Sequence, residues 1–179
     1  MKILFISDIH GVPDNLKYIE GIIYSKKITK LVVLGDLYYN DLPYTEDKEN
    51  KSLKVKEFLN NYKDILICMR GNCDSIVDIM TSNFPICEGL SIICTDGIDI
   101  YLNHGHEYSK NKNRCFNKGI LVYGHEHIPY IEKVDDMIYI NVGSISLPRN
   151  ENNPTYMIYE NKQFTIYDIY GNVVKNIKL

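Results

Sequence analysis

The sequence predicts an α/β protein in which two β-sheets pack face to face and helices lie outside them. In the first half, short apolar runs alternate with stretches of helical periodicity, which is typical of βαβ units with parallel strands. In the second half, apolar runs are separated by turn-forming residues, which predicts hairpins and a β-meander. No linker, repeat or low-complexity stretch divides the 179 residues, so we expect one domain spanning residues 1–179.

The first half contains three apolar runs that predict buried strands, at residues 3–6, 31–34 and 65–69. The spacing of apolar residues predicts an amphipathic helix over 14–27, with Asp14 as its N-cap, and a second helix over 52–63. A helix of one or two turns is expected at 75–80. Residues 38–51 are polar and rich in turn formers, so we expect a long loop over the end of the second strand.

The second half reads mostly as strands. Residues 90–94 and 98–102 flank an Asp96-Gly97 turn and predict an antiparallel hairpin. Further strands are expected at 120–123 and 137–141. The last three, at 156–159, 163–170 and 173–177, alternate around short turns and predict a meander.

Composition excludes several classes of protein. The chain is 45% hydrophobic and 24% charged, with a net charge of −3, so no basic surplus favours a nucleic-acid polymer as partner. The apolar runs are too short to cross a membrane, and the N-terminal run reads as a strand rather than a signal peptide. The five cysteines form no Cys-x-x-Cys pair, which argues against a disulfide framework. We therefore expect a cytoplasmic protein without a membrane partner.

All five histidines fall in three short patterns that follow predicted strands: Asp8-x-His10, His104-x-His106 and His125-x-His127. Other polar residues occupy the same kind of position, because Asp36 follows the second strand and Asn72 follows the third. The carboxyl ends of parallel strands meet at one edge of a sheet, so we expect these side chains to converge.

Carboxylate, amide and imidazole donors together suit Mn²⁺, Fe²⁺, Zn²⁺, Co²⁺ or Ni²⁺. The candidates outnumber the four ligands of a structural zinc site, which indicates two metal ions. A pair of metals lowers the pKa of a bridging water and neutralises phosphoryl oxygens during in-line attack. The pattern therefore predicts phosphoryl chemistry.

Five blocks in order resemble the calcineurin-like metallophosphoesterase superfamily: Asp8-x-His10, Gly35-Asp36, Gly71-Asn72-x-Asp74, His104-Gly105-His106 and Gly124-His125-x-His127. The Gly-Asn-Cys-Asp form of the third block resembles the YfcE-type phosphodiesterases of that superfamily. The resemblance extends to about Arg149, and it implies a four-layer α/β/β/α sandwich of two mixed sheets with flanking helices.

The resemblance also implies a ligand set and a cofactor. One metal ion would be held by Asp8, His10 and His127, and the second by Asn72, His104 and His125, with Asp36 bridging the two. Asp36, Asn72 and His104 would be the catalytic residues. The implied cofactor is a pair of divalent ions, Mn²⁺ first and Ni²⁺, Fe²⁺, Zn²⁺ or Co²⁺ as alternatives.

Cys73 departs from the family pattern, because many relatives carry a histidine there that helps the leaving group. A thiol is a poor proton donor, so we expect slower chemistry and a preference for good leaving groups. Cys73 and His106 are predicted substrate contacts, although His106 could instead orient His104. Asp74 is expected to cap the helix at 75–80 or to bind a ligand histidine.

Two arginines, Arg70 and Arg149, lie beside motif blocks and could bind phosphate through paired N–H groups. The sequence thus predicts a dinuclear metal-dependent phosphodiesterase that hydrolyses a small phosphate ester by attack of a metal-bridging hydroxide. The alternatives are a phosphomonoesterase, or a catalytically weak metal-binding scaffold for protein–protein interaction such as the retromer subunit of this fold. The edge strands of the meander make a homo-oligomer possible.

Overall fold

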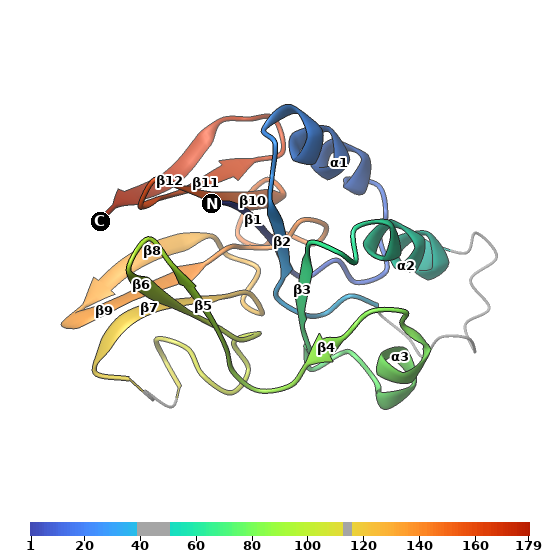
Figure 1. Cartoon of the computed structure of the whole chain (residues 1–179), viewed down its shortest axis with the longest axis horizontal. Helices are drawn as coiled ribbons and strands as arrows, with labels where there is room; N and C mark the ends of the chain where they lie inside the picture. The colour runs from blue at the N-terminus through green and yellow to red at the C-terminus, as the bar shows by residue number, and fades with distance from the viewer. Residues whose placement is uncertain (39–50, 113–115) are drawn as a thin grey trace.

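The computed structural model describes residues 1–38, 51–112 and 116–179, so the predicted loop at 38–51 lies almost wholly outside the described residues (Figure 1). The first half contains β1 (Lys2–Ile6), α1 (Leu16–Ser25), β2 (Lys30–Val33), α2 (Lys51–Asn61), β3 (Leu66–Met69) and α3 (Ile76–Thr81). The second half contains β4 (Ile86–Cys87), β5 (Ser91–Thr95), β6 (Ile98–Leu102), β7 (Lys118–Tyr123), β8 (Tyr130–Val134), β9 (Asp136–Asn141), β10 (Thr155–Glu160), β11 (Gln163–Asp168) and β12 (Val173–Lys178).

The strands form two mixed sheets, as the sequence predicts. The seven-stranded sheet has the order β12-β11-β10-β1-β2-β3-β4, in which β1 to β4 are parallel and the meander β10 to β12 joins antiparallel at β1. The five-stranded sheet has the order β5-β6-β7-β9-β8, in which β6, β7 and β9 are parallel. Parallel strands at the centre of both sheets place several strand ends on the same side of the molecule.

Alternating side chains bury both faces of the central strands. Phe5 and Val32 point into the core between the sheets, where they join Val122 and Ile140 of the five-stranded sheet. Their neighbours along the strands, such as Leu4, point to the opposite face, against which α1 and α2 pack. Each such side chain contributes about 1.5–3 kcal/mol when it is fully buried.

The outer face of the five-stranded sheet carries an aromatic layer. Leu121, Tyr123 and Tyr139 are buried there, and the ring of Tyr101 stacks on Phe116 at a centroid distance of 3.8 Å. Within the described residues, α1 and α2 flank the seven-stranded sheet, and α3 lies beside β4 at its edge (Figure 1).

Two details of the sequence prediction were wrong or incomplete. Helix α1 begins after Asn15 rather than Asp14, and the Asn15 side chain makes no capping bond because its amide donates to the Ile145 carbonyl at 2.8 Å. The sequence analysis also missed β4 and β8. Strand β4 is only two residues long, and β8 is an edge strand whose Glu132 and Lys133 are exposed, so neither has an apolar run.

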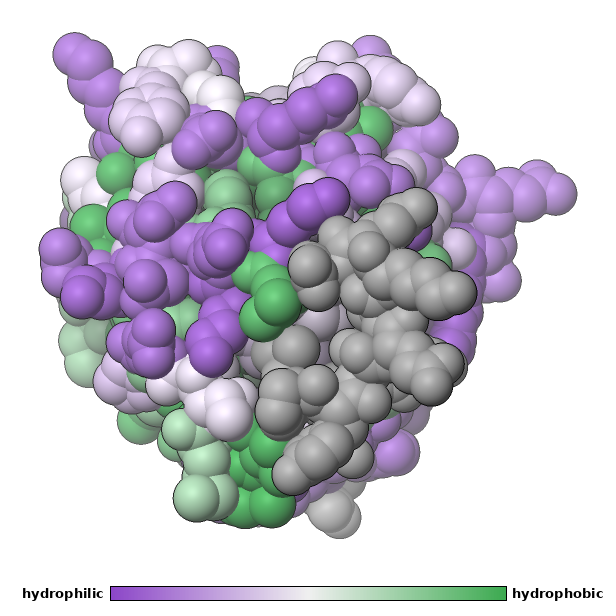
Figure 2. Space-filling model, turned by 90° about the vertical axis from the view of Figure 1, so that its right-hand side faces the viewer, coloured by the Kyte–Doolittle hydropathy of each residue, from purple (hydrophilic) through white to green (hydrophobic). Residues whose placement is uncertain are grey.

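In the described ranges, no helix is long and apolar enough to cross a membrane. Figure 2 shows the face on the helical side, where hydrophilic side chains predominate among the coloured residues and a group of hydrophobic ones lies at the lower edge.

Candidate metal centre

The structure brings the seven predicted ligands together from five strand ends. Asp8 and His10 follow β1, Asp36 follows β2, and Asn72 follows β3 of the seven-stranded sheet. The remaining three follow the five-stranded sheet, His104 after β6 and His125 and His127 after β7.

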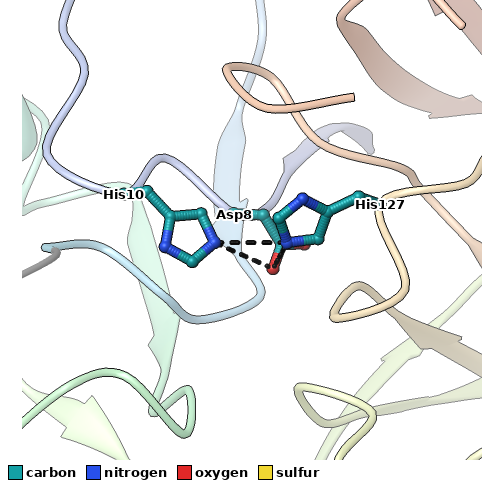
Figure 3. Close-up of side chains that lie close together, drawn as sticks. All are labelled: Asp8, His10 and His127. Atoms are coloured by element: carbon teal, nitrogen blue, oxygen red, sulfur yellow. Dashed lines mark hydrogen bonds and ion pairs between the residues drawn. The ribbon is translucent and has the colours of Figure 1, made fainter. Parts of the chain in front are cut away.

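Asp8, His10 and His127 form the first cluster, and their side chains point toward one another (Figure 3). The Nε2 atom of His127 lies 3.2 Å from Asp8 Oδ1 and 3.2 Å from His10 Nε2. His127 Nδ1 donates to the Leu147 carbonyl at 2.6 Å, so its Nε2 keeps a lone pair for the cluster. The side chains are nearly inaccessible to solvent.

The second cluster contains Asp36, His104 and His125. His104 Nε2 lies 3.2 Å from Asp36 Oδ2 and 3.1 Å from the Asn72 side-chain oxygen. His104 Nδ1 donates to the Leu34 carbonyl at 2.7 Å, which fixes the ring as the carbonyl of Leu147 fixes His127. The His125 ring lies 5.1 Å from that of His104.

Asp36 lies between the two clusters. Its Oδ2 atom is 3.6 Å from His10 Nε2 in the first cluster and 3.2 Å from His104 Nε2 in the second. Its Oδ1 atom accepts a hydrogen bond from the Cys73 backbone N–H at 2.8 Å. The carboxylate is therefore held at one oxygen and faces both groups of imidazoles with the other.

Five of the seven residues adopt a left-handed backbone conformation. Asp8, His10, Asp36, His125 and His127 have φ values from 51° to 68°. Such conformations cost about 1 kcal/mol or more each in residues other than glycine, and they concentrate at functional sites. Sharp turns of this kind let residues two apart, as in Asp-x-His and His-x-His, turn toward the same point.

Two glycines allow the loops to approach one another. A Cβ on Gly71 would lie 2.0 Å from Asp36 Oδ1, and a Cβ on Gly124 would lie 1.9 Å from Ser7 Oγ and 2.5 Å from Asp8 Oδ2. Side chains at either position would displace a carboxylate of the site.

Charge within the centre shifts several pKa values. Burial by itself would raise the pKa of Asp36, but the hydrogen bond and charge of His104 outweigh it and hold that pKa well below its usual range. Burial lowers the pKa of His10 and of His125, which favours their neutral form. The pKa of His104 is raised, because the hydrogen bond with Asp36 and the charge of Asp8 outweigh the effect of burial.

Asp74 has a different role from the one predicted. Ser75, not Asp74, caps α3, in a capping box with Asp78. The buried Asp74 carboxylate instead accepts backbone hydrogen bonds from Asp36 at 2.9 Å, Leu37 at 2.8 Å and Gly71 at 2.8 Å. It therefore ties the Asp36 loop to the loop after β3, and the prediction missed this because nothing local in the sequence distinguishes it from a cap.

Cys73 and His106 lie at the edge of the centre. The Cys73 sulfur lies close enough to His10 and Asp36 to share a metal ion with them. Burial, together with the nearby charge of Asp36, raises the pKa of Cys73 to about 12. The ring of His106 is 5.5 Å from the ring of His104, and it belongs to none of the metal-ligating groups found among the described residues.

Two hollows adjoin the centre and meet at Asn72, which lines both. We call the larger, of about 550 Å³, the wide hollow. It is lined by His10, Asp36, Asn72, Cys73, His125, Glu126, His127, Ile128, Leu147 and Arg149. We call the smaller, of about 320 Å³, the side hollow, and it is lined by Arg70, Gly71, Asn72, Glu88, Gly89, His106 and Glu107. The sequence singled out both arginines but gave no sign of Glu88 or Leu147.

Comparisons with known proteins agree with this geometry. A family model described as the calcineurin-like phosphoesterase superfamily domain matches residues 1–163. The chain is 31% identical over 167 residues to phosphodiesterase YfcE of Escherichia coli K12, covering 93% of this chain and 91% of that protein. It is 26% identical to a probable metallophosphoesterase of Mycoplasma pneumoniae, covering 79% of this chain and 96% of that protein.

Solved structures give the same result for the fold. The structure of the E. coli phosphoesterase YfcE superposes with a TM-score of 0.87 at 30% identity, covering 99% of this chain and 98% of that one. Vacuolar protein sorting 29 from Cryptosporidium parvum has a TM-score of 0.63 at 17% identity, covering 99% of this chain and 98% of that one, which shows a shared fold alone.

Proposed function

The chain belongs to the calcineurin-like phosphoesterase superfamily, and we propose that it is a phosphodiesterase with a dinuclear metal centre. Membership makes it a metal-dependent hydrolase of phosphate esters. The proposal concerns the number of metal ions, the residues that hold them and the preference for diesters.

The donor atoms of the site fit two divalent ions. Asp8 Oδ1 is buried and has no hydrogen-bond partner among the described residues, which is costly for a carboxylate unless a cation faces it. We assign one set of ligands, Asp8, His10 and His127, to the first metal ion. A second set, Asn72, His104 and His125, is assigned to the second ion. Oxygen and imidazole donors in this mixture suit Mn²⁺, our first choice, and also Ni²⁺, Fe²⁺, Zn²⁺ or Co²⁺.

The observation that carries the dinuclear proposal is the position of Asp36. One of its oxygens lies within 3.6 Å of a ligand nitrogen from each set, and the side chain is 3% exposed. A carboxylate in that place can bridge two ions, whereas a single ion would need only one of the sets.

The residues around the centre then have definite tasks. Two divalent ions held by these residues would activate water as the nucleophile and would neutralise the charge that develops on the phosphoryl oxygens. The Cys73 N–H holds Asp36 Oδ1 and thereby orients Oδ2 between the clusters. The carbonyls of Leu34 and Leu147 fix the rings of His104 and His127, so the donor atoms need little rearrangement during the reaction.

Cys73 limits the range of leaving groups. A thiol cannot carry the positive charge that a histidine in this place could, and it is a poor proton donor to an alkoxide. We therefore expect the enzyme to favour esters with acidic leaving groups.

The test uses metal-free protein and two chromogenic esters, bis(p-nitrophenyl) phosphate and p-nitrophenyl phosphate. Mn²⁺, Ni²⁺, Zn²⁺ and Mg²⁺ are added back in turn, and bound metal is counted for each chain. We expect two Mn²⁺ ions per chain and faster hydrolysis of the diester. Faster hydrolysis of the monoester would make the protein a phosphomonoesterase, and one ion per chain would refute the dinuclear centre.

Asp36→Ala and His104→Ala should each lower hydrolysis by about 10³-fold or more, since each removes a contact that positions charge against the transition state. Asp64→Ala, on an exposed residue after α2, is the matched control and should keep full activity. Full activity in the Asp36 variant would refute the assignment of the bridging ligand.

A further inference from the structure

The side hollow has a lining unlike that of the wide hollow. Its described lining consists of two glycines and five polar or charged residues, with no apolar side chain. The wide hollow, in contrast, includes Ile128 and Leu147. A group that enters the side hollow therefore exchanges water for hydrogen-bonding partners rather than for apolar surface.

Two opposite charges in the side hollow are paired with each other. Arg70 donates through Nη1 to the Glu88 carboxylate and through Nε to the Asp74 carbonyl at 3.1 Å. The pairing of β3 with β4 sets Met69 beside Cys87, so Arg70 and Glu88 emerge side by side at the next position. The guanidinium offers further N–H donors and the carboxylate further lone pairs, on neighbouring groups.

This arrangement favours one kind of ligand. The Arg70 charge is balanced by Glu88, so the pair gives little net attraction to a second anionic group. A pair of hydroxyls on neighbouring carbon atoms can instead accept from the guanidinium and donate to the carboxylate. His106 also lines the hollow and adds to its polar character.

The position of Asn72 connects the hollow to the reaction. Its side-chain oxygen contacts His104 of the second cluster, and Asn72 lines both hollows. A phosphoryl group at the metal centre can therefore direct one ester arm into each hollow.

We propose that the side hollow binds a hydroxyl-bearing arm of the substrate, such as a glycerol or ribose unit, and that Arg70 and Glu88 determine this specificity. The inference rests on the proposed function, because it assigns the arms of a diester. The less polar arm would lie in the wide hollow against Ile128 and Leu147.

The experiment compares two diesters that differ only in two hydroxyl groups, p-nitrophenyl 2,3-dihydroxypropyl phosphate and p-nitrophenyl propyl phosphate. In both, water supplies the entering oxygen, the P–O bond to the aryl group breaks, and p-nitrophenolate leaves. We expect kcat/KM of the Mn²⁺-loaded enzyme to be about tenfold or more higher for the dihydroxypropyl ester, as two hydrogen bonds to charged groups would give.

Glu88→Gln should reduce that ratio toward one. Loss of the Glu88 charge leaves Arg70 unpaired, which changes the attraction of the protein for both esters equally, because both are monoanions. The ratio of the two kcat/KM values therefore reports the hydroxyl contacts alone. Glu160→Gln is the matched control, because Glu160 is also an exposed glutamate in an ion pair, with Lys2 at 3.0 Å, and lies outside both hollows. It should keep the wild-type ratio.

Calorimetry with glycerol 3-phosphate and propyl phosphate repeats the comparison without turnover. A wild-type ratio near one, or an unchanged ratio in Glu88→Gln, would overturn the inference while leaving the phosphodiesterase intact. Absence of hydrolysis of both esters would instead refute the proposed function. In that case, if the protein bound glycerol 3-phosphate more tightly than propyl phosphate and lost this difference in Glu88→Gln, the result would still support hydroxyl binding in the side hollow.

Discussion

Asp74→Asn tests how firmly the chain holds the proposed bridging carboxylate. In the native protein, Asp74 Oδ2 accepts from the N–H groups of Asp36 and Gly71, and Oδ1 accepts from those of Leu37 and Tyr38. Asparagine offers one acceptor oxygen and one NH₂ group, so two of these buried N–H groups would face a donor in either orientation.

The expected loss of unfolding free energy follows from the two lost acceptors. A buried N–H without a partner costs about 1–3 kcal/mol, which gives about 2–6 kcal/mol for the pair. Burial raises the pKa of Asp74 to about 6, so burying its charge is itself unfavourable, and asparagine removes that cost. We therefore expect a loss near the lower end, about 2–3 kcal/mol of unfolding free energy at pH 7.

Urea unfolding of the metal-free variant measures the loss, and calorimetric titration with Mn²⁺ measures the effect on the site. Because Asp74 holds the backbone of Asp36, Mn²⁺ affinity should fall by about 10- to 100-fold. Asp64→Asn, a change of the same kind at an exposed position, should alter neither quantity. A loss below about 1 kcal/mol with unchanged Mn²⁺ affinity would refute the reasoning.

Four further substitutions, one of them a control, test other parts of the structure. Gly124→Ala should displace Asp8 and weaken Mn²⁺ binding, which calorimetry measures. Gly21→Ala is the control in α1, where the new Cβ meets no neighbouring atom within 4 Å, and it should raise the free energy of unfolding by about 0.5–1 kcal/mol in urea. Equal effects of the two substitutions would contradict the steric argument. Burial alone would raise the pKa of Asp168, but its hydrogen bonds with Asn172 hold that pKa below the usual range. Asp168→Ala should therefore cost about 1–2 kcal/mol at pH 7, and the difference from wild type should shrink as pH falls below about 4 through the folded-state pKa, as urea unfolding at several pH values would show. Cys73→His should raise kcat about tenfold or more for an alkyl leaving group and less for p-nitrophenol, and equal changes would argue against proton donation at this position.

The strand ends were predictable because an apolar run followed by a polar residue marks where a buried strand leaves the core. Parallel strands then bring residues far apart in sequence, such as Asp8 and Asp36, to one edge. The role of Asp74 was not predictable, since a carboxylate before a short helix reads locally as a cap. Glu88 was missed for a related reason, because its place beside Arg70 depends on the pairing of a two-residue strand that has no periodic pattern.

The backbone conformations of the candidate metal centre lower the stability of the fold. Five left-handed residues at about 1 kcal/mol each amount to roughly 5 kcal/mol, a large part of the 5–15 kcal/mol by which domains are stable. Glycine would relieve the strain at each position but would remove the donor atom. The compensation is local, because the backbone N–H groups of Asp8, His10 and His125 bind Gly35 O at 3.1 Å, Asp36 O at 2.9 Å and Asp8 Oδ2 at 2.9 Å. These bonds join the strained loops to one another. A change in one loop, as in Asp74→Asn, should therefore displace donor atoms contributed by both sheets.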